Sequence, residues 1–164
     1  MRFNHPANST EVGHVVGLYL CPDAPSDTIR NEDFGGNSYA ANSGTEPGKD
    51  DGVMFPLSNI RLSDIVDGTS HTVSVGEIFY ENLGWARGAV QGGGGGGGGN
   101  NGGCDAGFAR GVARWWKCCS GCALPGLNPP PTSCNNSCER KFQYSSFHEG
   151  GAFFALADGH VLFV

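Results

Sequence analysis

Apolar residues along the chain gather in a few short stretches, separated by long polar segments. The first stretch predicts a buried strand that ends at Cys21-Pro22, because β-branched and leucine side chains recur within it at Val12, Val15, Val16, Leu18 and Leu20. Residues 21–52 follow with few apolar positions, so they are expected to form a loop anchored by Tyr39.

The second stretch covers residues 53–90 and carries the clearest periodicity. Ile60, Leu62 and Ile65 predict a short helical turn, with Ser58 or Asn59 as its N-cap. Asp67-Gly68 predicts a turn. Strand periodicity follows, because Val73, Val75, Glu77 and Phe79 alternate with Thr72, Ser74 and Gly76. Residues 83–90 are expected to supply the partner strand.

The third stretch, His148 to Val164, predicts a β-hairpin. Asp158-Gly159 lies between two five-residue runs, which is typical of a two-residue type I′ turn. This turn pairs residues 153–157 with residues 160–164.

Composition places these elements in one small domain with long loops. Glycine supplies 28 and proline 9 of the 164 residues, charged residues are only 16 %, and large aliphatic residues are scarce from 91 to 140. We therefore expect a single domain over residues 1–164 of the α+β class, mostly β. It has an antiparallel sheet, a terminal hairpin, little helix and a Gly/Cys-rich insertion at about 91–140.

The charge pattern excludes two classes of partner. The net charge is −6, the sequence pI is near 5.2, and no basic run occurs. Nucleic acid and anionic membrane are therefore not expected partners. No window of eighteen apolar residues is present, so no segment of this chain is expected to span a bilayer.

Seven cysteines bear on the compartment of the protein. Six of them fall within 35 residues of the polar insertion, where disulfides replace a missing core, and an extracellular or cell-surface location follows. The spacings Cys119-x2-Cys122 and Cys134-x3-Cys138 also occur in zinc and iron–sulfur sites, but the odd total favours disulfides with at least one cysteine left over. The disulfide candidates are Cys21, Cys104, Cys118, Cys119, Cys122, Cys134 and Cys138.

Two acidic loops are candidate calcium sites, since calcium binds carboxylate, hydroxyl and carbonyl oxygens. The first contains Asp64, Asp67 and Ser70, and the second contains Asp50 and Asp51. In the alternative interpretation these side chains only cap their own turns. Calcium is the one cofactor that the sequence suggests.

His148 and Asp158 form a third candidate, a general base with an orienting carboxylate. The sequence names no nucleophile for such a site, and the hairpin explains Asp158 and Gly159 without one. We therefore expect His148 to fix the loop that enters the hairpin.

The order of motifs resembles the DUF1559 family, planctomycete-type proteins that are similar to type IV pilins and pseudopilins. The resemblance is carried by "FNHPANSTEVGHVVGLYLCPDAPSD", "NSYAANSGT", "IRLSDIVDGTSHTVSVGE" and the ending "SSFHEGGAFFALADGHVLFV". In that ending His148, Asp158 and Gly159 match the family's His-x9-Asp-Gly pattern. The resemblance implies a pilin-like globular head that lacks the N-terminal hydrophobic helix, and by analogy it strengthens the calcium prediction.

Three functions are compatible with these observations. The favoured one is a structural subunit of an extracellular fibre or of a secretion or adhesion apparatus. It acts by binding copies of itself and not as an enzyme. The alternative is a monomeric binding module for carbohydrate or for calcium-dependent adhesion, which uses Trp115-Trp116. A hydrolase built on His148 is the least favoured, because no nucleophile motif is present.

Overall fold

The structure is a computed structural model that describes residues 5–25, 30–31, 34–46, 49–55, 58–79, 84–87, 113–116, 127–128 and 143–164. Six of the seven cysteines and the glycine run lie outside these ranges, so the disulfide and insertion predictions stay predictions. No helix within the described ranges has the length and apolar character needed to cross a membrane.

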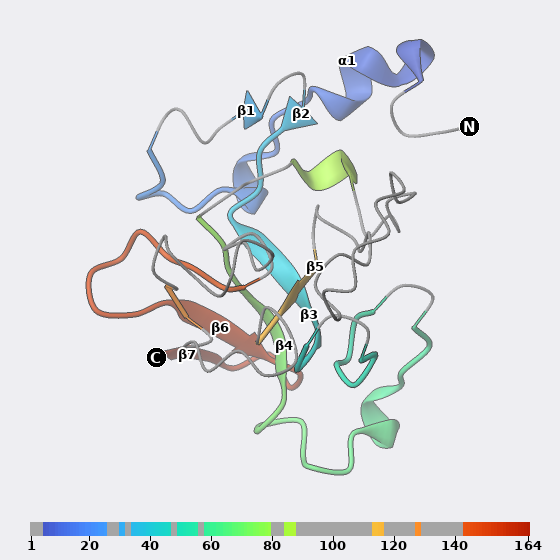
Figure 1. The fold of residues 1–164 in the computed structure, drawn as a ribbon, viewed down its shortest axis with the longest axis vertical. Coiled ribbons are helices and arrows are strands. Elements are labelled where there is room, and N and C mark those ends of the chain that lie inside the picture. Colours follow the sequence, from blue (N-terminus) through green and yellow to red (C-terminus); the bar gives the residue numbers. More distant parts are fainter. Residues whose placement is uncertain are drawn as a thin grey trace, which may run out of the picture.

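A mixed sheet dominates the described part of the chain (Figure 1). Its order is β5 (Ala113–Trp115), β3 (Tyr39–Gly44), β4 (Val73–Glu77), β6 (Phe153–Leu156) and β7 (Val161–Phe163). β3, β4, β6 and β7 are antiparallel neighbours, and β5 runs parallel to β3. Two short strands, β1 (Arg30–Asn31) and β2 (Phe34–Gly35), pair separately. The predicted mostly β fold with a terminal hairpin is confirmed.

The strand register assigns rows of side chains to two faces of the sheet. Tyr39 of β3 pairs with Glu77 of β4, and Phe153 of β6 pairs with Phe163 of β7. The register between β4 and β6 aligns these two pairs, so one row of side chains crosses four strands. A second row on this face runs through Ala41, Val75, Ala155 and Val161. Because side chains alternate along a strand, Ala40, Gly76 and Phe154 lie on the opposite face.

The opposite face carries the hydrophobic core. Its buried members are Ala40, Ile78, Tyr144, Ala152 and Phe154. The rings of Tyr144 and Phe154 meet edge to face with centroids 5.2 Å apart, and Trp116 packs 5.8 Å from Phe154. Gly76 is required here, because an added Cβ would lie 2.5 Å from the Phe154 ring. By packing against Phe154, Trp116 anchors the end of β5 on this face of the sheet.

Short helical turns replace two of the expected strands. Residues 12–20 do not form a strand: α1 (Ser9–Val12) and the 3-10 turns η1 (Pro6–Asn8) and η2 (Gly17–Tyr19) occupy this region, and Leu18 is 85 % exposed. Glycines at 13 and 17 interrupt the apolar run, and local hydrogen bonds such as Tyr19 N–H to Val16 O take up the backbone.

The expected partner strand at 83–90 is also wrong within its described residues. Trp85–Arg87 is a 3-10 turn, η5, and the neighbours of β4 are β3 and β6. The predicted helical turn is present as η4 (Leu62–Asp64), although its N-cap is Arg61 and not Ser58 or Asn59. The predicted turn at Asp67-Gly68 is confirmed, with Gly68 at φ +91°.

The terminal hairpin has a different turn from the predicted one. Leu156 N–H donates to His160 O, so three residues, Ala157 to Gly159, form the loop. Only Gly159 has positive φ (+91°), whereas a type I′ turn needs two such residues. Phe153 consequently pairs with Phe163 and not with Val164. This shift of one residue places Val161 and Phe163, and not Leu162, on the same face as Glu77.

Candidate functional site

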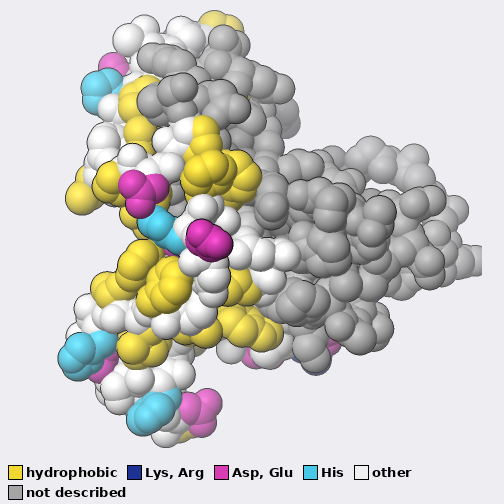
Figure 2. Space-filling view, turned by 90° about the vertical axis from the view of Figure 1, so that its left-hand side faces the viewer, with side chains coloured by type: hydrophobic (Ala, Val, Ile, Leu, Met, Phe, Trp, Pro, Cys, Tyr) yellow, Lys and Arg dark blue, Asp and Glu magenta, His cyan; other side chains and the backbone are white. Residues whose placement is uncertain are grey.

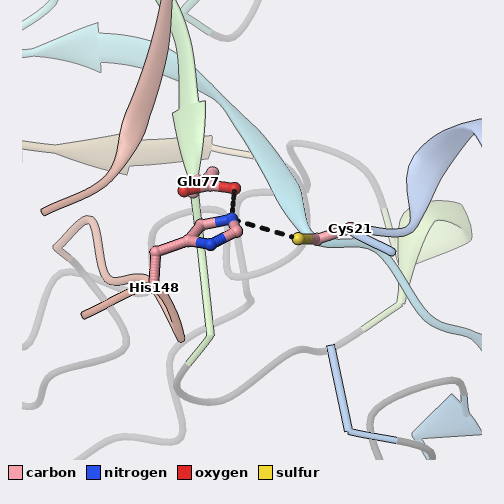
Figure 3. A group of neighbouring side chains, drawn as sticks. All are labelled: Cys21, Glu77 and His148. Atoms are coloured by element: carbon pink, nitrogen blue, oxygen red, sulfur yellow. Dashed lines mark hydrogen bonds and ion pairs between the residues drawn. The ribbon is translucent and has the colours of Figure 1, made fainter. Parts of the chain in front are cut away.

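Three side chains from distant parts of the chain meet at one end of β4 (Figure 3). Cys21 follows η2, Glu77 is the last residue of β4, and His148 lies in the loop before β6. His148 Nε2 lies 3.4 Å from Cys21 Sγ and 3.2 Å from Glu77 Oε1. Both contacts converge on the same ring nitrogen, as the dashed lines in Figure 3 show.

Glu77 is buried at the centre of this cluster, with 3 % of its surface exposed. Its Oε2 accepts hydrogen bonds from Ser146 Oγ (2.7 Å) and from Phe153 N–H (2.8 Å). Its Oε1 is the oxygen that faces His148. The carboxylate therefore joins β4 to the loop before the hairpin and to the first residue of β6, and these contacts offset the desolvation of a buried acid.

His148 is held from several sides. Its Nδ1 lies 3.4 Å from Asp23 Oδ2, and its backbone N–H donates to Ser146 Oγ. Its ring stands edge to face against Phe153, 5.2 Å away, and against Phe163, 6.4 Å away. His148 thus contacts the N-terminal loop, β4 and both strands of the hairpin. That His148 fixes the loop entering the hairpin stays a prediction.

Cys21 is a buried free thiol in this structure, although it was a disulfide candidate. Burial raises its pKa, and the nearby carboxylates of Glu77 and Asp23 raise it further, against a lowering backbone hydrogen bond. An activated thiol nucleophile has the opposite property, a lowered pKa. The cluster brings a thiol to His148 that the sequence did not indicate.

A cavity of about 400 Å³ opens beside the cluster. All three residues of the cluster contribute to its wall, and the remaining wall is mainly apolar, formed by residues such as Tyr39, Val75, Phe153 and Val161. A second cavity of about 380 Å³ shares Tyr39 and Val75 and extends to Tyr19 and Trp85. Burial raises the pKa of Tyr39, and the acidic groups of Cys21 and Glu77 add to the effect.

Asp158, the expected partner of His148, pairs with another histidine. Its Oδ1 accepts from His160 N–H (3.0 Å), and its Oδ2 lies 2.9 Å from His160 Nδ1. The side-chain hydrogen bond and the opposite charge lower the pKa of Asp158 and raise that of His160. Asp158 and Gly159 therefore belong to the turn, as predicted, while the carboxylates facing His148 are Glu77 and Asp23.

The two acidic loops contain carboxylates that close their own turns. Asp64 Oδ2 accepts from Arg61 N–H, and Asp51 accepts from both Thr45 N–H and Thr45 Oγ1. Partial burial raises the pKa of Asp51, but the hydrogen bonds from Thr45 prevail and lower it. Ser70 Oγ lies 3.4 Å from His71 Nδ1. Calcium at Asp50 and Asp51 or at Asp64, Asp67 and Ser70 stays a prediction.

Sequence reasoning missed Glu77 as a site residue and assigned Cys21 to another role. One signal for Glu77 was present: it is a charged residue on the same face as Val73 and Val75 in a predicted strand. Cys21 stands 83 positions before the next cysteine, far from the cysteine-rich insertion, which set it apart from the other six.

Comparison with known proteins identifies the family of the chain. The family model described as "Protein of unknown function (DUF1559)" matches residues 1–164. No curated protein and no solved structure matches the chain. The match covers every residue and agrees with the family that the motifs resemble. The chain belongs to the DUF1559 family.

Proposed function

We propose that this chain is a structural subunit that works by binding copies of itself, outside the cell, and not as an enzyme. The observation that carries the proposal is the edge strand β7. Val161, Leu162, Phe163 and Val164 are each about half exposed or more, at 62 %, 48 %, 50 % and 60 %. No charged residue interrupts this run.

Edge strands of monomeric proteins are usually protected from pairing. Short length, charged side chains, proline and bulges are the common means. β7 is short, at three residues, but residues 161–164 contain neither a charged side chain nor proline. Figure 2 views the molecule from the left-hand side of Figure 1, where the C-terminus lies. On that side, hydrophobic side chains gather around a histidine and acidic groups. An edge of this kind is suited to pairing with another strand.

A second copy of the chain fits this edge by its own pattern. If β7 pairs antiparallel with β7 of the copy about Leu162, Val161 of one copy lies opposite Phe163 of the other. The rows of apolar side chains on both faces then continue across the contact, as they do between β6 and β7. Further contacts that do not close into a ring are needed to extend such a pair into a fibre.

The test is the oligomeric state of the whole chain, measured by analytical ultracentrifugation over a range of concentrations. We expect concentration-dependent association that Leu162→Lys abolishes. Leu18→Lys is the matched control, because Leu18 is also a strongly exposed leucine but lies in η2, outside the sheet. A wild-type chain that stays monomeric, or association that both variants weaken equally, would contradict the proposal.

A monomeric binding module is the second candidate. It is supported by the two neighbouring cavities of about 400 and 380 Å³, whose walls include Tyr19, Tyr39 and Trp85. Aromatic walls of this size suit sugars and other small amphipathic ligands. Electron microscopy separates the candidates: isolated particles together with saturable sugar binding favour the module, and regular assemblies favour the subunit.

A further inference from the structure

The cluster of Cys21, Glu77 and His148 has no part in the proposed function. Among the described residues it is the one group in which three thiol, imidazole or carboxylate donors approach one another within 4.8 Å. Each donor comes from a different chain segment, and all three face one cavity.

The arrangement at Nε2 is unusual for hydrogen bonding alone. A single ring nitrogen carries either one hydrogen or one lone pair, so it makes one strong hydrogen bond. Here Cys21 Sγ and Glu77 Oε1 approach the same nitrogen at 3.4 and 3.2 Å. Three donor atoms that lie within 4.8 Å of one another are an arrangement that can hold a metal ion.

The two separations that involve His148 Nε2 agree with tetrahedral coordination. With the usual zinc–sulfur, zinc–nitrogen and zinc–oxygen bond lengths, the ligand atoms of a tetrahedral zinc site lie about 3.4–3.6 Å apart. The separations of 3.4 and 3.2 Å are within about 0.2 Å of that range. Thiolate and imidazole ligands favour zinc and its neighbours in the first transition series over calcium or magnesium.

The surroundings of the three donors also match those of metal sites. His148 Nδ1 faces Asp23 Oδ2 at 3.4 Å, so the carboxylate directs Nε2 towards the cluster. Glu77 Oε2 is occupied by Ser146 Oγ and Phe153 N–H, which leaves Oε1 as the single ligand oxygen. Asp23 faces Nδ1, on the other side of the ring, and is not one of the three donors that approach one another around Nε2.

We propose that Cys21, Glu77 and His148 bind one Zn²⁺ ion and leave its fourth position open to the cavity of about 400 Å³. Three protein ligands with one exchangeable position are the pattern of zinc sites that bind an additional small molecule. The mainly apolar wall around that position favours a small ligand with one anionic or sulfur donor atom and an apolar body. Its three ligands lie outside β7, although Val161 of that strand lines the cavity and Phe163 packs against His148.

The first test is cobalt substitution of the whole, chelator-treated chain, because Co²⁺ reports its ligands spectroscopically. We expect one Co²⁺ per chain with a thiolate-to-cobalt charge-transfer band, which Cys21→Ser removes. His160→Gln, which alters an exposed histidine, is the matched control and should keep the band. The absence of any band that depends on Cys21 would overturn the proposal, and so would equal loss of the band in both variants.

The second test measures zinc affinity by competition with a chromophoric chelator. Asp23→Asn should keep the cobalt spectrum and weaken zinc binding about 10- to 100-fold, as loss of an outer-sphere partner does. Circular dichroism of the metal-free variants checks that they are folded. Unchanged zinc affinity in Glu77→Gln would contradict Glu77 as a ligand, and unchanged affinity in Asp23→Asn would contradict the outer-sphere role of Asp23.

The open position has its own readout. Added azide should shift the visible bands of the cobalt form by binding the metal. An unchanged spectrum at saturating azide would show that the position is closed, and would overturn that part of the proposal.

Discussion

Among the described residues, two histidines face carboxylates, and the two pairs arise in different ways. His160 meets Asp158 two residues away, in the exposed turn of the hairpin. His148 meets Glu77 from a distant strand, and only 20 % and 4 % of the two side chains are exposed. The first pair arises from local turn geometry, whereas the second requires the assembled sheet. We therefore expect the second to contribute much more to stability.

The largest effect is expected from Glu77→Ala. It leaves Ser146 Oγ, Phe153 N–H and His148 without their buried partner, which should cost about 3–5 kcal/mol in the free energy of unfolding. Urea unfolding in chelator-containing buffer measures it. Glu149→Ala, which alters an exposed acid, is the control and should change little. A loss below about 1 kcal/mol would contradict the buried role of Glu77.

His148→Gln should have the next largest effect, about 1.5–3 kcal/mol in the same measurement, because it removes the ring that joins Glu77, Asp23 and the hairpin. His160→Gln is the matched variant from the exposed pair and should cost less. If the two variants lose equal stability, the distinction between the pairs fails.

Gly159→Ala tests the turn that holds the exposed pair. Gly159 has φ +91°, where a Cβ costs about 1–2 kcal/mol even though the space around it is open. Gly159→Asn should lose less, since asparagine tolerates this conformation. Gly17→Ala also enters open space but without positive φ, and thermal unfolding should show little loss there. Equal melting temperatures for Gly159→Ala and Gly17→Ala would refute the assigned turn.

The smallest effect is expected from Asp158→Asn, and it depends on pH. Because the pKa of His160 is raised, the stability that its protonated ring contributes is complete below pH 6.5 and is lost as pH rises through that raised pKa. Because the pKa of Asp158 is lowered, the stability that its carboxylate contributes is present above pH 3.8 and is lost as pH falls through that lowered pKa. The pair therefore stabilises most between pH 3.8 and 6.5.

Thermal unfolding at about pH 5 and about pH 8 checks this window. Asp158→Asn should lower the melting temperature more at the acidic pH. Histidine proton chemical shifts should also show that the pKa of His160 falls towards its ordinary value in the variant. A larger loss at the alkaline pH would contradict the sign of the linkage.

The elements that the sequence predicted correctly are those with local signals. Alternation from Val73 to Glu77 indicated β4, and Asp158-Gly159 indicated the hairpin, although the conformation of Gly159 set the register one residue away from the predicted one. β3 was missed because its sequence, "YAANSG", is small and polar and lacks an apolar alternation. Among its buried residues, Ala40 pairs with Gly76 in the ladder, and Ser43 Oγ donates to Met54 O.

The candidate site was predictable only in part. His148 was singled out by its motif, but its partners come from residues 21, 23 and 77, and only the assembled sheet brings them together. Nearby sequence offered Asp158 as the acid, and the turn uses that carboxylate for His160 instead. Periodicity assigns a residue to a face of a strand, but it does not identify the distant loops that cover that face.

A double-mutant cycle between His148 and Glu77 tests the central claim most directly, that a buried pair of distant residues joins the N-terminal loop, β4 and the hairpin. The cycle uses His148→Gln, Glu77→Gln and the double variant, unfolded by urea without metal. We predict a coupling energy of about 1–3 kcal/mol, larger than that of the corresponding cycle between His160 and Asp158. A coupling energy below about 0.5 kcal/mol, or one no larger than that of the exposed pair, would contradict the account.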